Sequence, residues 1–158
     1  MKKIIKTVLY LFVITGIISS CKKEKPYDPH KQLEIDEGLI KAYIADSIPA
    51  VRHSSGVYYV IGEQGNGDTI VNADTEIKAK YSLRLMNGPV ITPVDTITFR
   101  LGDNIIEGWK IGVPLISEEG KIRLFLPSGW AYGPYRKGNI PPNSILDFKI
   151  ELIKVDNK

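Results

Sequence analysis

The segment from Glu76 to Met86 alternates charged or polar side chains with apolar ones over eleven residues. The apolar set is Ile77, Ala79, Tyr81, Leu83 and Leu85, and the opposite set is Glu76, Lys78, Lys80, Ser82 and Arg84. A period of two is typical of an antiparallel strand with one buried face. Asn87-Gly88 follows at once and is a strong hairpin-turn signal. The chain is therefore predicted to build an antiparallel sheet whose apolar face needs a cover.

Other segments complete this sheet. Strands are predicted at Gly56–Ile61, Ile97–Leu101, Lys121–Leu126 (Ile122, Leu124 and Leu126 inward) and Ile145–Val155 (Leu146, Phe148, Ile150 and Leu152 on one face). The segment 104–116 holds Trp109 and predicts one or two helical turns, limited by Pro114. It is the expected cover of the apolar face, so the predicted class is α+β. The long Gly- and Pro-rich loop 128–144 indicates a functional loop.

An amphipathic helix is predicted before the sheet, within residues 32–50. Its apolar residues recur every three or four positions, and Pro49 ends it: Ile35, Leu39, Ile40, Tyr43, Ile44 and Ile48. Two roles stay open for this helix, because periodicity does not separate dimerisation from packing on the same domain. The oligomeric state is therefore left open.

The first twenty residues have the pattern of a secretory signal. Lys2, Lys3 and Lys6 precede an apolar run of about 11 residues, too short to span a bilayer as a helix. The run ends in Ile18-Ser-Ser before Cys21, the only cysteine, and this ending resembles the bacterial lipobox. The resemblance implies acylation of Cys21 and a membrane anchor; an uncleaved anchor with an incidental cysteine is the alternative.

We therefore expect a protein of the cell envelope, anchored by lipid in the outer membrane and facing the periplasm. The expected organisation is a signal peptide over 1–20, a tether over 21–31, a helix over 32–50 and a folded domain over 51–158. A length of 158 residues fits one such domain with short accessories.

The basic net charge belongs to the leader. The first twenty residues contain three of the 21 basic residues and no acid, so the remaining 18 basic residues balance the 18 acidic ones. A balanced domain does not have the electrostatic footprint of a nucleic-acid-binding protein. No nucleic-acid partner is expected.

Several catalytic chemistries lack the residues they need. The only histidines are His30 and His53, and the one cysteine lies in the lipobox. No cluster offers the three or four ligands of a zinc site, and no nucleophile and base form a credible triad. No metal and no cofactor are predicted.

Five ordered motifs between residues 56 and 155 resemble the FKBP-type peptidyl-prolyl isomerases. They are Phe99-Arg-Leu-Gly, Ile105-Ile106-Glu-Gly-Trp109, Leu126-Pro-Ser-Gly-Trp-Ala-Tyr132-Gly, Ile140-Pro-Pro-Asn and Leu146-Asp-Phe148-Lys-Ile-Glu-Leu152. The resemblance implies an antiparallel sheet of five or six strands curled around a short helix. With the lipobox and the leading helix, the chain resembles the FKBP-type lipoproteins of Bacteroidetes-like bacteria.

The resemblance also implies a proline-binding pocket and its residues. Trp109 would form the floor, Tyr81, Phe99, Ile105 and Phe148 the walls, and Ile140 would cap one rim. The N–H of Ile106 and the hydroxyl of Tyr132 would donate to substrate carbonyls. The partners would be proline-containing polypeptides, and the reaction would be rotation of the X–Pro bond, which needs neither nucleophile nor metal.

The chain departs from the family pattern after the Asn87-Gly88 turn. Ile91 and Thr92 stand where most members have a Phe-Asp pair, and Asp95, three residues on, is a candidate substitute for the carboxylate. Ile91 is then expected to line the substrate pocket. Two functions follow: a membrane-anchored isomerase that assists folding of exported proteins, or an FKBP-fold chaperone or binding module without useful catalysis.

Overall fold

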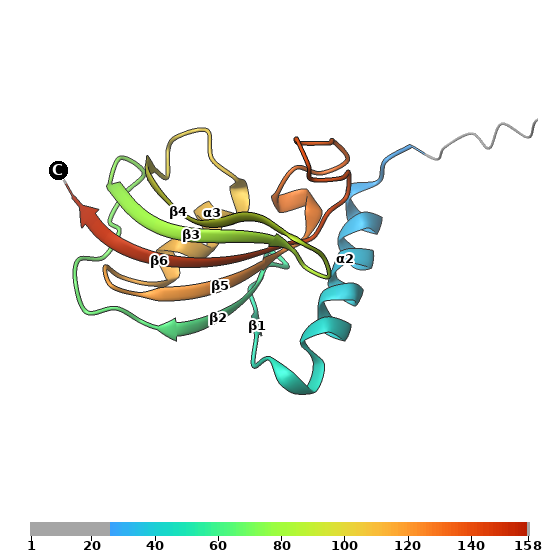
Figure 1. The fold of residues 1–158 in the computed structure, drawn as a ribbon, viewed down its shortest axis with the longest axis horizontal. Helices are drawn as coiled ribbons and strands as arrows, with labels where there is room; N and C mark the ends of the chain where they lie inside the picture. The colour runs from blue at the N-terminus through green and yellow to red at the C-terminus, as the bar shows by residue number, and fades with distance from the viewer. Residues whose placement is uncertain (1–25, 158) are drawn as a thin grey trace, which may run out of the picture.

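A computed structural model describes residues 26–157. The expected signal peptide and the lipidation site Cys21 lie outside the described residues. Six antiparallel strands form one curved sheet, with a short helix behind it and a longer helix against one end (Figure 1). This is the predicted α+β architecture. None of the helices in this part of the chain is long and apolar enough to cross a bilayer.

The sheet follows the order β1-β2-β5-β6-β3-β4. The strands are β1 Val51–Arg52, β2 Tyr58–Glu63, β3 Glu76–Leu85, β4 Val90–Arg100, β5 Lys121–Leu126 and β6 Leu146–Asp156. Strand β3 lies between β6 and β4 and carries the predicted alternation, with Ile77, Ala79 and Leu83 buried. The predicted hairpin is also present, since the N–H of Gly88 donates to the carbonyl of Leu85 at 3.0 Å.

The apolar face of the sheet is covered as predicted. Helix α3, Glu107–Gly112, and the 3-10 turn η3, Val113–Leu115, lie on the concave face (Figure 1). The main core joins Trp109 and Val113 to buried residues of the strands, including Leu124, Phe148 and Leu152. A second 3-10 turn, η4 Ser128–Trp130, opens the long loop before β6.

The leading helix differs from its prediction in bounds and in buried face. Helix α2 spans Pro29–Ile44 and is followed by the 3-10 turn η2, Ala45–Ser47. It begins in the expected tether because Asp28 caps it, accepting from the N–H of His30 at 3.0 Å and of Lys31 at 3.2 Å. The predicted stripe was partly wrong, because Ile35 and Leu39 are about half exposed (48% and 51%).

The buried stripe of α2 is instead Asp36, Ile40 and Ile44, at a spacing of four. Ile40 and Ile44 belong to a second, smaller core with Phe125 of β5, and the rings of Tyr43 and Phe125 lie 5.9 Å apart. Phe125 points away from the main core, so α2 covers one end of the sheet's convex face. The helix therefore packs on its own domain.

Two strands differ from their predicted limits by two residues or more. Strand β4 begins at Val90 instead of Ile97 and includes Pro93. It is an edge strand, where a missing backbone N–H is tolerated. Strand β2 begins at Tyr58 and not at Gly56, whose positive φ of 93° places it in a turn.

Candidate functional site

A cavity of about 680 Å³ lies between α3, the concave face of the sheet and the long loop. Its lining comes from segments far apart in the sequence: Tyr81, Leu83, Ile91, Thr92, Ile97, Asn104, Ile105, Ile106, Glu107, Trp109, Ala131, Tyr132, Lys137, Ile140 and Phe148. Most of these side chains are apolar or aromatic, as is usual for sites that bind small apolar groups. The volume is also in the range of such sites.

Trp109 is the centre of an aromatic cluster in this cavity. Its ring lies 5.3 Å from that of Tyr81 and 5.4 Å from that of Phe148, and both pairs meet edge to face. Three ring contacts fix the orientation of the indole, because Phe99 packs on it as well, at 5.3 Å. The buried Nε1 of Trp109 has no hydrogen-bond partner among the described residues.

Two glycines set the depth of the cavity. Gly108 and Gly112 lie one helical turn apart on α3, and a Cβ on either would come within 2.5 Å of Leu126 or Leu124, respectively. Both leucines are fully buried in β5. Without these Cβ atoms α3 lies close against β5, and this close approach places Trp109 under the cavity.

Tyr132 offers an unpaired hydroxyl to the cavity. It follows η4 and is half-buried, and none of the described residues hydrogen-bonds to its hydroxyl. Burial, with a smaller contribution from Tyr81, raises the pKa of Tyr132 above its usual value of 10.0. The hydroxyl therefore stays protonated and able to donate at neutral pH.

Ile106 provides a second donor. It is the N-cap residue of α3, and its backbone N–H donates to no other described residue. Orphan N–H groups at the start of a helix are well placed to bind an oxygen. A ligand in the cavity thus meets an apolar floor together with two groups able to hold carbonyl oxygens.

The rim of the cavity is closed by a tight turn of the long loop. The N–H of Lys137 donates to the carbonyl of Ile140 at 3.0 Å, and the N–H of Ile140 donates back at 2.9 Å. Gly138 makes this possible because it has a positive φ of 55°. Ile140 is buried by the turn, while Lys137 is exposed beside it.

The structure brings together most of the residues expected in the pocket. Tyr81, Ile91, Ile105, Ile106, Trp109, Tyr132, Ile140 and Phe148 all line this cavity. Phe99 does not line it, since it is 4% exposed and packs behind Trp109 as part of the core.

Asp95 does not supply the missing carboxylate. It is exposed on β4, where its Oδ1 accepts from the N–H of Thr96 at 2.7 Å. Register shifts between Tyr81 and Arg84 separate it from Thr92, which does line the cavity. The position of the family's Phe-Asp pair thus offers a smaller apolar group and a hydroxyl.

Some lining residues were not predicted from the sequence. Leu83 was assigned to the core alone, while Asn104, Glu107 and Lys137 carry no pattern of their own. The Gly138-Asn139 pair was the available signal for Lys137, since a two-residue turn there pairs Lys137 with Ile140. Glu107 is held by Lys110 at 2.8 Å on the exposed side of α3.

Neither histidine lies at the cavity. His30 is in the first turn of α2, and Nδ1 of His53 lies 2.9 Å from the hydroxyl of Ser55. In residues 26–157, no three His, Cys, Asp or Glu side chains gather as ligands for a metal ion.

A sheet curls over a short helix, and an aromatic cavity with two free hydrogen-bond donors lies between them. A comparison with protein-family models identifies the class: residues 67–153 match the family "FKBP-type peptidyl-prolyl cis-trans isomerase". Because this match covers more than half of the chain, the chain belongs to the FKBP-type peptidyl-prolyl cis-trans isomerase family.

Individual relatives agree with this assignment. The chain is 40% identical over 111 residues to the isomerase FkpA of Buchnera aphidicola subsp. Schizaphis graminum, covering 66% of this chain and 42% of that protein. A probable FKBP-type isomerase of Haemophilus influenzae is 33% identical over 150 residues, covering 92% of this chain and 61% of that protein. The chain thus spans about half the length of these two relatives.

Solved structures agree on the fold. The crystal structure of FkpA from Escherichia coli superposes with a TM-score of 0.69 at 29% identity, over 80% of this chain and 60% of that chain. A peptidyl-prolyl isomerase from Pseudomonas syringae pv. tomato gives a TM-score of 0.68 at 25% identity, over 84% of this chain and 99% of that chain.

Proposed function

We propose that this protein is a membrane-anchored peptidyl-prolyl cis-trans isomerase that assists the folding of exported proteins. The observation that carries the proposal is an apolar cavity centred on Trp109 and lined by the unpaired hydroxyl of Tyr132. The substrate would be a polypeptide whose proline ring fills the cavity over the indole.

The reaction needs no bond to be broken. Rotation of a peptide bond faces a barrier of about 18–20 kcal/mol, which arises from amide resonance. An X–Pro bond therefore interconverts over tens to hundreds of seconds without a catalyst. A cavity of Trp109, Tyr81 and Phe148 withdraws the bond from water, which disfavours the polar planar amide relative to the twisted one.

The two hydrogen-bond donors would add to the preference for the twisted amide over the planar one. The hydroxyl of Tyr132 and the N–H of Ile106 would donate to carbonyl oxygens next to the proline. They would hold these oxygens in place while the X–Pro bond twists. Groups that fit the twisted form better than the planar one lower the barrier. A millionfold acceleration corresponds to about 8 kcal/mol, within reach of desolvation combined with a few fixed hydrogen bonds.

A non-catalytic FKBP-fold chaperone or binding module is the second candidate. The observation that favours it is that Ile91 and Thr92 line the cavity where the family pattern has a Phe-Asp pair, so the cavity has neither that ring nor that carboxylate. Such a module would still bind proline-containing segments. It would not accelerate their isomerisation.

The anchoring part of the proposal depends on the lipobox-like ending at Cys21. An acylated Cys21 would place the domain at the outer membrane, facing the periplasm, as in the lipoprotein subgroup of Bacteroidetes-like bacteria. Metabolic labelling with a palmitate analogue tests the acylation of Cys21 directly. Labelling that persists in Cys21→Ser would contradict it.

The activity is tested with the purified protein on a short X–Pro peptide and on an unfolded protein whose refolding is limited by proline isomerisation. A rate above background that falls in Trp109→Phe supports the isomerase. Binding of both substrates without acceleration of either would support the binding module.

A further inference from the structure

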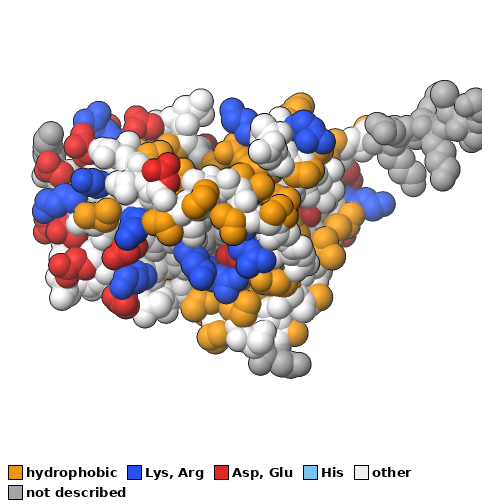
Figure 2. All heavy atoms as spheres, viewed as in Figure 1, with side chains coloured by type: hydrophobic (Ala, Val, Ile, Leu, Met, Phe, Trp, Pro, Cys, Tyr) orange, Lys and Arg blue, Asp and Glu red, His pale blue; other side chains and the backbone are white. Residues whose placement is uncertain are grey.

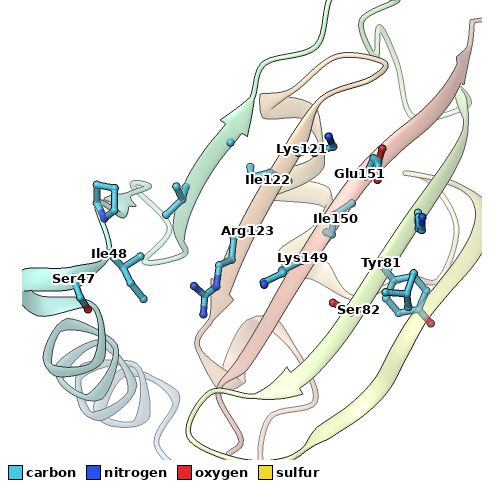
Figure 3. Close-up of a pocket in the computed structure, with 15 residues that line it drawn as sticks. Ser47, Ile48, Tyr81, Ser82, Lys121, Ile122, Arg123, Lys149, Ile150 and Glu151 are labelled. Carbon is cyan, nitrogen blue, oxygen red and sulfur yellow. The ribbon is translucent and has the colours of Figure 1, made fainter.

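A second groove lies on the convex face of the sheet, opposite the Trp109 cavity. Helix α2 covers only one end of this face, over Phe125, and the groove opens beyond the end of that helix. It has a volume of about 590 Å³ and is bordered by the turn 47–49 and by strands β2 to β6 (Figure 3). Figure 2 shows Lys and Arg side chains gathered on this side of the molecule, with hydrophobic side chains beside them.

The floor of the groove carries two cations next to each other. Arg123 of β5 and Lys149 of β6 are directly opposite in the sheet, and both project into the groove (Figure 3). Like charges in this position destabilise a sheet. Arg123 is compensated by Asp147, which accepts from its Nε at 2.9 Å and its Nη2 at 2.8 Å. Lys149 forms no ion pair with any residue between 26 and 157.

The neighbouring row of residues across the strands has no excess of positive charge. Lys121 contacts Glu63 at 2.8 Å and lies opposite Glu151, which in turn lies opposite Lys80. Acids and bases therefore alternate across the strands in that row. The unbalanced positive charge of the groove is concentrated at Lys149.

The sides of the groove are apolar. Ile48, Pro49 and Val60 form one side, and Val94, which is 65% exposed, forms the other. A ligand that fits must therefore present a negative charge in its middle and apolar groups to both sides. An extended polypeptide provides this arrangement, since residues two positions apart point to the same face of its backbone.

We propose that this groove binds an extended segment of a client polypeptide that has an acidic residue with an apolar residue two positions away on each side, and that its carboxylate binds Lys149. The site requires no proline and is independent of the isomerase activity proposed above.

The charges and shape of the groove disfavour other occupants. The chain's own residues 1–25 contain six lysines and a single acid, so they have the same sign as the floor. A second copy would bring one basic floor against another. The flat surface of an anionic bilayer would meet the sides of the groove before its floor.

The test uses the purified protein and two fluorescent, proline-free peptides that contain the pattern Val-Ser-X-Ser-Val, where X is Glu in one and Lys in the other. We expect the Glu peptide to bind, with an affinity that weakens as salt is added, and the Lys peptide not to bind. Lys149→Glu should weaken binding about tenfold, and Val94→Ser about threefold. Lys31→Glu, the same charge change on exposed α2, should leave binding unchanged.

Two readouts separate a loss of binding from a loss of fold or of catalysis. Lys149→Glu should leave the unfolding temperature close to that of the wild type, because residue 149 is exposed and Arg123 is already paired with Asp147. It should also leave the rate on X–Pro peptides unchanged, since Lys149 does not line the Trp109 cavity.

Equal binding of both peptides, or no effect of Lys149→Glu, would overturn the proposal. So would self-association that Lys149→Glu abolishes, or binding to phosphatidylglycerol vesicles without binding to the Glu peptide. These outcomes are independent of isomerase activity, so a failure of one proposal does not imply a failure of the other.

Discussion

Asp36 and Ser128 are 92 residues apart in the sequence and are joined by two hydrogen bonds. Oδ2 of Asp36 accepts from the N–H of Ser128 at 2.7 Å and from its hydroxyl at 2.6 Å. Both residues are almost completely buried. Because Ser128 begins the loop that carries Tyr132, this contact connects helix α2 to the position of the proposed donor.

Asp36→Ala should therefore lower both stability and activity. It leaves two buried donors of Ser128 unsatisfied, which costs about 2–4 kcal/mol in the free energy of unfolding. Asp36→Asn retains one acceptor and should cost about 1 kcal/mol. Urea unfolding measures both, with Glu34→Ala on the exposed side of α2 as the matched control. A stability equal to wild type in Asp36→Ala would show that the contact does not hold the loop.

The close approach of α3 to β5 predicts an effect of a single methyl group. Gly108→Ala would place a Cβ within 2.5 Å of the buried Leu126, so the helix must move or the core must repack. We expect a loss of about 1–3 kcal/mol in stability together with reduced isomerase activity, because Trp109 moves with the helix. Gly129→Ala, with no atom near its Cβ, is the control. Unchanged activity in Gly108→Ala would show that the depth of the cavity does not depend on this contact.

The pH profile of the proposed activity should be flat through the neutral range. Burial raises the pKa of Tyr132, so its hydroxyl stays protonated up to and beyond its usual value of 10.0. Activity should therefore be constant between about pH 6 and pH 9 and fall only as the pH rises beyond that range. A midpoint near pH 6.5, the range of histidine, would contradict this account of the donor.

Acid should weaken the attachment of α2 through Glu37. Hydrogen bonds from Arg52 lower the pKa of Glu37 below its usual value of 4.5, and the shortest of them measures 2.6 Å. A lowered pKa means that the stability is present above about pH 4.5 and is lost as the pH falls through the lowered value. Glu37→Gln should thus flatten the loss of stability between about pH 5 and pH 3. If Glu37→Gln unfolds in acid just as the wild type does, Glu37 contributes nothing to the pH dependence of stability.

The local features of the fold could be predicted from the sequence because they depend on neighbouring residues. The alternation around Tyr81, the Asn87-Gly88 turn and the short helix holding Trp109 are such features. The buried face of α2 could not be predicted in this way. Asp36 is buried because its carboxylate is satisfied both by Gln32, one helical turn earlier, and by Ser128, far along the chain.

The cavity, too, could be predicted from the sequence only in part. The resemblance brought Trp109, Tyr132 and Ile106 together, but alternation and motifs alone did not distinguish the lining from the core. Phe99 and Phe148 look equivalent in the sequence, yet Phe99 lies behind the indole while Phe148 lines the cavity. That difference depends on strand pairing, which no local pattern encodes: Phe99 lies opposite the buried Ile77, while Phe148 lies opposite Leu83, which lines the cavity.

The most direct test of the central claim compares Tyr132→Phe with Tyr135→Phe in an X–Pro isomerisation assay. Both variants lose one hydroxyl from the same loop, but Tyr135 is 75% exposed and does not line the cavity. We predict that Tyr132→Phe lowers kcat/KM about five- to tenfold, the contribution of one hydrogen bond, while Tyr135→Phe matches the wild type. Equal activity in all three proteins, or no activity in the wild type, would contradict the account.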